Sequence, residues 1–271
     1  MKFDSNLAWK QAATAVSANR EVLLALAGVF FMLPQLAFAI FYPQPEPTAT
    51  MTEKEMVAMV MAYYGSVLPV AIPMALLQAL GTLALLGLLD GQRRPTVGES
   101  IKDSLKGVVP YLLAQLMGVL GLMLVALPVM GALAALGGTA GAVIAVAIVA
   151  VVGIYVGVRF SLTAAVVAVE RVFNPIKALV RSWHLTRRNT ARLLGFYALF
   201  ILAFVVILIM ANVVIGIPLA LLAPDHVATI IQALLGSVLS AVMALYFVAI
   251  IAASHRQLAG NTPETDSAPF M

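Results

Sequence analysis

The chain has 271 residues, of which 62% are hydrophobic and 10% are charged, whereas soluble globular domains are about half apolar and about a quarter charged. This composition argues against a water-soluble fold, and the absence of cysteine excludes disulfides, thiolate nucleophiles and thiolate metal sites. The net charge is +4, and its cations lie beside apolar segments, which favours membrane phospholipid over nucleic acid as the anionic partner.

The N-terminal part predicts a surface helix followed by a membrane-spanning helix. Within residues 1–20, one helical face carries Trp9, Ala12, Ala13 and Val16, and this spacing predicts a short helix lying in the membrane interface. Residues 22–42 contain no charge. At about 1.5 Å per residue, this segment is long enough to cross a hydrocarbon core of about 30 Å.

The longest uncharged segment must fold back on itself. Residues 107–158 carry no charge and are about twice as long as one span needs, and the glycine-rich stretch 137–141 offers the only reasonable break. The prediction is an all-α membrane protein with a single domain over residues 1–258 and a disordered cytoplasmic tail at 259–271. Its six transmembrane helices are expected at 22–42, 66–89, 109–136, 142–169, 194–222 and 227–254.

The six spans pair into three hairpins, and an amphipathic interfacial helix is expected before each hairpin. Besides residues 1–20, the segment 96–108 opens with a possible capping box formed by Thr96 and Glu99. The segment 174–187 opens with an asparagine cap followed by proline. This alternation indicates a three-fold repeat. The alternative is that the three units are alike only because membrane hairpins resemble one another.

The orientation of the chain follows from its lysine and arginine residues. With both termini inside, the cytoplasmic face carries 15 of the 16 Lys and Arg residues, and only Lys54 lies outside. Cytoplasmic loops of membrane proteins carry the excess of positive charge. We therefore expect both termini in the cytoplasm.

The segment 170–192 holds the densest cluster of cations. Its basic row, at helical spacing, consists of Lys177, Arg181, His184 and Arg188. Its apolar stripe, about 100° round the helix, consists of Ile176, Leu179, Val180 and Trp183. In one interpretation the cations bind a phospholipid headgroup or a soluble phosphate, and in the other they only set the orientation. No interleaved aromatic residues favour nucleic-acid binding.

This region also resembles a known family. Arg159-Phe160-Ser161-Leu162, Val169-Glu170-Arg171, the stretch 178–186 and Asn189 look like the signature of the YciC-like bacterial inner-membrane proteins. They are also similar to the membrane domain fused to some glycerophosphodiester phosphodiesterases. The resemblance implies a multi-pass protein of the bacterial inner membrane with envelope or phospholipid-related work. It carries over no enzymatic activity, because no phosphodiesterase catalytic domain is present.

The sequence offers no catalytic constellation and no cofactor or metal site. The polar residues inside the expected spans are Arg159, Gln78, Gln115, Asn212 and Gln232. In one interpretation they line a polar cavity, since an intramembrane cation is costly and often functional. In the other, the amides form ordinary interhelical hydrogen bonds and Arg159 snorkels to the cytoplasmic interface.

Three functions are compatible with these features. The leading expectation is a non-enzymatic protein of envelope or phospholipid homeostasis that contacts anionic lipid through its basic interfacial helices. The second is a small transporter or channel with a polar intramembrane site around Arg159. The third is an accessory membrane subunit of an enzyme or export complex, and a homo-oligomer is left open.

Overall fold

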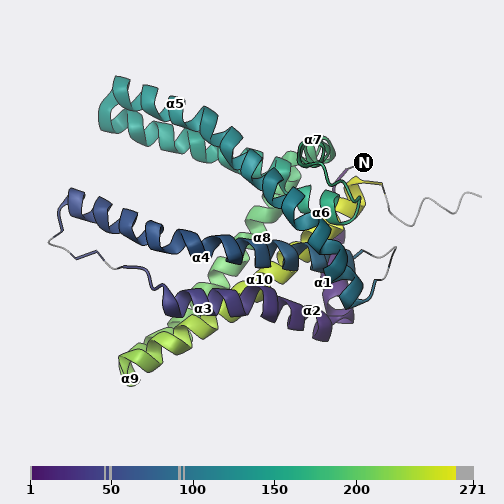
Figure 1. Ribbon diagram of the computed structural model, residues 1–271, viewed down its shortest axis with the longest axis horizontal. Coiled ribbons are helices and arrows are strands. Elements are labelled where there is room, and N and C mark those ends of the chain that lie inside the picture. Colours follow the sequence, from purple (N-terminus) through teal and green to yellow (C-terminus); the bar gives the residue numbers. More distant parts are fainter. Residues whose placement is uncertain (1, 46, 49–50, 91–92, 94, 261–271) are drawn as a thin grey trace, which may run out of the picture. The chain divides into compact units, whose positions relative to one another are not determined.

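The computed structural model describes residues 2–45, 47–48, 51–90, 93 and 95–260 (Figure 1). A tail was expected at residues 259–271, and its residues 261–271 lie outside the described residues. The described residues form helices and no strand, in agreement with the predicted all-α class. In chain order the helices are α1 (Ser5–Ala18), α2 (Arg20–Ala27), the π-helix η1 (Gly28–Met32), α3 (Leu33–Phe41), α4 (Glu53–Leu88), α5 (Val97–Phe160), α6 (Thr163–Ala168), α7 (Pro175–Thr186), α8 (Thr190–Ala211), the π-helix η2 (Asn212–Gly216), α9 (Ile217–Leu222) and α10 (Asp225–Leu258).

Five helical segments in the described part of the chain are long and apolar enough to cross a membrane. They are Arg20–Phe41, Glu53–Leu88, Val97–Ala168, Thr190–Leu219 and His226–Leu258. The sequence predicted six spans, and the difference arises in the third segment. It has 72 residues and contains both spans expected at 109–136 and 142–169.

Helix α5 changes direction within the glycine-rich stretch. Gly138 has φ 54° and ψ −135°, a backbone conformation that essentially only glycine adopts. The two arms of α5 then lie against each other (Figure 1). A Cβ atom on Gly118 would lie 3.5 Å from the Phe160 ring, and one on Gly153 would lie 3.5 Å from the Leu122 side chain. The reversal therefore falls where the sequence predicted a break.

The expected surface helices differ in how they join the spans. Helices α1 and α7 are separate, whereas the segment 96–108 is continuous with the first arm of α5. The capping box at its start is present: the Glu99 amide donates to the Thr96 hydroxyl at 3.3 Å, and the Thr96 amide donates to the Glu99 carboxylate at 2.9 Å. The helix continues because no helix-ending cap follows, and Pro110 is accommodated inside it.

The chain divides into two compact units, and the first comprises residues 1–18, 82–201 and 246–271. The core of this unit is built around α6, in which Ala165 and Val166 have no exposed surface. Gly107 of α5 lies close to the side chains of Leu83 and Val167, since an added Cβ would be 3.1 Å from each. The short helix α6 is thus enclosed by the elements that carry the candidate site.

The second unit comprises residues 19–81 and 202–245, and both π-helices lie in it. Helix η1 ends two residues before Pro34, and η2 ends two residues before Pro218. A proline lacks the backbone N–H and its ring clashes with the carbonyl one turn earlier. A wider π turn relieves that clash.

Candidate functional site

Helix α7 is fixed at its start by its own sequence. The side chain of Asn174 accepts a hydrogen bond from the Lys177 amide at 3.0 Å, and Pro175 occupies the first helical position. Asparagine caps the free amides of a helix start, and proline there loses no hydrogen bond. The helix ends at Thr186, immediately before the turn that leads into α8.

The face of α7 that packs on the protein is small and polar. It consists of Ala178, Ser182 and Thr186, which have no exposed surface. The hydroxyls of Ser182 and Thr186 donate to the backbone carbonyl of Arg159, at 2.9 and 3.3 Å. The last carbonyls of a helix have no partner within the helix, so these two hydroxyls cap the end of α5.

Arg159 is enclosed by protein at this junction, where only 2% of its surface is exposed. The Trp183 ring covers one face of the guanidinium, with its centroid 4.0 Å from Cζ, and the Tyr155 ring lies 5.7 Å away. Nη1 donates to the Thr190 hydroxyl at 3.3 Å, while Nε has no partner in the described structure. Cation–π attraction of this kind is strongest when the charge is desolvated.

Three of the intramembrane amides, Gln115, Asn212 and Gln232, form hydrogen bonds with partners other than Arg159. Gln115 is exposed and donates to the Tyr111 hydroxyl at 2.9 Å. Asn212 and Gln232 are also exposed, and they donate to the carbonyls of Leu208 and Gly216. Gln78, like Asn212 and Gln232, belongs to the second unit, whereas Arg159 and Gln115 belong to the first.

The basic row of α7 faces outward. Lys177, Arg181, His184 and Arg188 are all exposed. Beside them, Ile176 is 56% exposed and Val180 is 49% exposed, so the outer surface of α7 combines a basic row with an apolar stripe. Arg181 also forms a double hydrogen bond with the Glu170 carboxylate, the closer contact being 2.9 Å from Nε to Oε2.

Glu170, which lies between α6 and α7, links α7 to α10. Besides Arg181, its carboxylate accepts a hydrogen bond from Nε2 of His255, which is buried in α10, at 2.9 Å. Partial burial raises the pKa of Glu170. Hydrogen bonds and electrostatic attraction from His255 and Arg181 lower it by more, so that the pKa falls from 4.5 to about 2. The carboxylate is therefore ionised at neutral pH.

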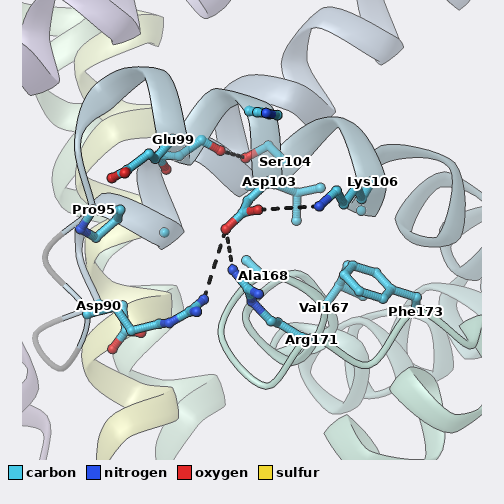
Figure 2. A pocket seen from close by; sticks show the side chains of 16 residues that line it. Asp90, Pro95, Glu99, Asp103, Ser104, Lys106, Val167, Ala168, Arg171 and Phe173 are labelled. Carbon is cyan, nitrogen blue, oxygen red and sulfur yellow. Dashed lines mark hydrogen bonds and ion pairs between the residues drawn. The ribbon is translucent and has the colours of Figure 1, made fainter.

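A charged pocket lies on the other side of the Glu170–Arg171 turn (Figure 2). It has a volume of about 490 Å³ and is centred on Asp103. Figure 2 shows Asp103 facing Lys106 and Arg171, with which it forms ion pairs, and Arg93 completes the set. Arg171 has φ 55°, so the backbone turn directs Glu170 and Arg171 to different partners.

The sequence singled out Arg181 as a candidate for lipid contact, but it did not predict the contacts within these two charge clusters. Glu170 and His255 are 85 residues apart and Asp103 and Arg171 are 68 apart, so no local spacing links them. The one available signal was the charged pair Glu170-Arg171 directly after an apolar segment. In the described residues, no three His, Cys, Asp or Glu side chains are placed to hold a metal ion.

The five long apolar helices of the described residues indicate a membrane protein. The family model described as Domain of unknown function (DUF7847) matches residues 8–258, and the chain belongs to this family. Comparisons with curated proteins and with solved structures found no match. Membership of this family does not by itself link the chain to the YciC-like proteins or to the phosphodiesterase membrane domain.

Proposed function

We propose that this chain is a non-enzymatic, multi-pass protein of the bacterial inner membrane that acts in envelope or phospholipid homeostasis. It has six spans in three hairpins and both termini in the cytoplasm, and it contacts anionic phospholipid through basic interfacial helices. The resemblance of residues 159–195 to the YciC-like proteins supports the assignment to the inner membrane.

The outer surface of α7 carries this proposal. A helix that buries its small face on the protein still exposes Ile176 and Val180 next to Lys177. Such a surface suits the boundary of an anionic leaflet, where apolar side chains enter the acyl region and cations meet headgroup phosphates. Each cation near such a leaflet contributes about 1 kcal/mol, screened by salt.

The test replaces Lys177, a cation of α7 that has no ion pair among the described residues. Lys177→Gln should weaken the enrichment of phosphatidylglycerol over phosphatidylcholine around the purified protein. The expected loss is about 1 kcal/mol of lipid association at low salt, measured by mass spectrometry of co-purified lipid from mixed nanodiscs.

The matched control keeps the charge. Lys177→Arg should retain the enrichment, because the leaflet attracts either cation. Equal enrichment in the wild type and the glutamine variant would refute the proposed lipid contact.

A further inference from the structure

A cavity beside the start of α8 gathers cations without any carboxylate. Its volume is about 400 Å³, and its lining residues are Lys2, Arg188, Asn189, Ala191 and Arg192. Three of these five residues are cations. The charged pocket around Asp103 differs, because acidic side chains there neutralise the cations.

The N-terminal segment is held in place at this cavity. The Phe3 amide donates to the Asn189 side chain at 2.9 Å, and the Phe3 ring packs on Phe196. The amide of the next residue, Asp4, donates to Oε1 of Gln257 at 3.1 Å, and Nε2 of Gln257 donates to the Asp4 carbonyl at 3.2 Å. These contacts anchor the segment that carries Lys2. They hold Lys2 beside Arg188 and Arg192, which are far from it in the sequence.

The positive charge of this cavity is not compensated. In the part of the chain that the structure describes, no carboxylate forms an ion pair with Lys2, Arg188 or Arg192. Arg159 adds a further cation nearby, because it donates to Thr190, the first residue of α8. Cations confined together repel one another, and a bound anion would convert this repulsion into attraction.

We propose that this cavity binds a phosphate group. Two arginines and a lysine around one small cavity suit a tetrahedral dianion, since guanidinium groups form paired hydrogen bonds with phosphate oxygens. The phosphate belongs either to a phosphomonoester lipid headgroup or to a free anion. The lipid source rests on the proposed function, whereas binding of free phosphate stands without it.

The test uses the full chain in detergent with its purification tag at the C-terminus, because Lys2 is part of the site. Binding of inorganic phosphate is measured by calorimetry, and binding of phosphatidate is measured by native mass spectrometry. Lys2→Gln combined with Arg192→Gln should lower the affinity for phosphate at least about tenfold. Lys10→Gln combined with Arg20→Gln removes the same charge outside the cavity and should leave the affinity unchanged.

The outcomes separate the sources of phosphate. Tight binding of phosphatidate with weak binding of inorganic phosphate identifies a lipid headgroup, and comparable binding of both identifies the phosphate group alone. Binding of neither, or an equal loss in both double variants, overturns the site. Unchanged phosphatidylglycerol enrichment in the α7 variant, together with phosphate binding that depends on Lys2 and Arg192, would remove the proposed function and retain this site.

Discussion

Arg159 shows how a charged side chain is accommodated at the end of an apolar helix. Its guanidinium has no carboxylate within ion-pair distance in the described structure, so its charge is offset by the Trp183 ring and the Thr190 hydroxyl. Its backbone carbonyl is capped by Ser182 and Thr186. The residue therefore ties α5 to α7 and α8 at once. Its packing agrees with a joint between helices better than with the lining of a polar path.

Glu170, which links α7 to α10, makes the stability of the protein depend on pH. Its pKa is about 2 in the folded protein, against an ordinary value of 4.5. A carboxylate with a depressed pKa stabilises the fold fully above its ordinary pKa, and this contribution is lost as pH falls toward the folded value. The wild type should therefore lose at most about 3 kcal/mol between pH 4.5 and pH 2 through this group. The measurement is thermal unfolding of the detergent-solubilised chain across that range.

Glu170→Gln provides the comparison for this pH dependence. The variant should be less stable than the wild type at pH 7, because His255 and Arg181 lose their ionic partner. Its stability should fall less steeply than that of the wild type below pH 4.5. Parallel curves for the two proteins would show that Glu170 is not the group responsible.

Among the elements, α5 depends on a close approach of its two arms at the reversal. A Cβ on Gly141 would collide with the backbone carbonyl oxygen of Leu133, so Gly141→Ala requires a backbone shift. Gly137 has no atom within 4 Å of an added Cβ, and alanine favours helix over glycine by about 1 kcal/mol. We expect Gly141→Ala to destabilise the protein by about 1 to 3 kcal/mol and Gly137→Ala to be neutral or stabilising. Thermal unfolding in detergent checks both, and equal melting temperatures would contradict the close approach.

The sequence predicted where the surface helices lie but not which face of each is buried. The apolar stripe predicted for α7 includes Ile176 and Val180, which are exposed, and Leu179, which is buried. The face that packs on the protein includes Ala178, Ser182 and Thr186, which the sequence did not identify as a buried face. In a membrane, lipid tails are as apolar as leucine, so helices pack on the protein through small residues. Hydrophobic periodicity identifies the faces of such a helix, but it does not distinguish lipid from protein as their neighbour.

The same small-residue spacing recurs in all three surface segments. The buried positions are Ala8, Ala12 and Val16 in α1, Ser100, Ser104 and Val108 in α5, and Ala178, Ser182 and Thr186 in α7. Each set has the spacing i, i+4, i+8. Ser100 donates to the carbonyl of Ala84 near the end of α4, as Ser182 donates to the carbonyl of Arg159 near the end of α5. This correspondence favours a true three-fold repeat over a chance likeness of hairpins.

At the scale of the whole molecule, α5 decides how often the chain crosses the membrane. It has 64 residues, and at about 1.5 Å per residue it would be about three times as long as a hydrocarbon core of about 30 Å. It reverses direction at Gly138, as the proposed six spans require. Under that proposal Lys102 and Lys177 lie on the same side of the membrane.

Single-cysteine variants can test this topology, since the chain contains no cysteine. Lys102→Cys, Thr139→Cys and Lys177→Cys all replace exposed residues. With six spans and cytoplasmic termini, a membrane-impermeant maleimide should label Thr139→Cys in intact cells and the other two variants only after permeabilisation. Labelling of Lys102→Cys and Lys177→Cys from opposite sides would require α5 to cross once, and would refute the six spans. Labelling of both from outside, with Thr139→Cys protected, would preserve six spans and reverse the orientation, which the positive-inside distribution of charge opposes.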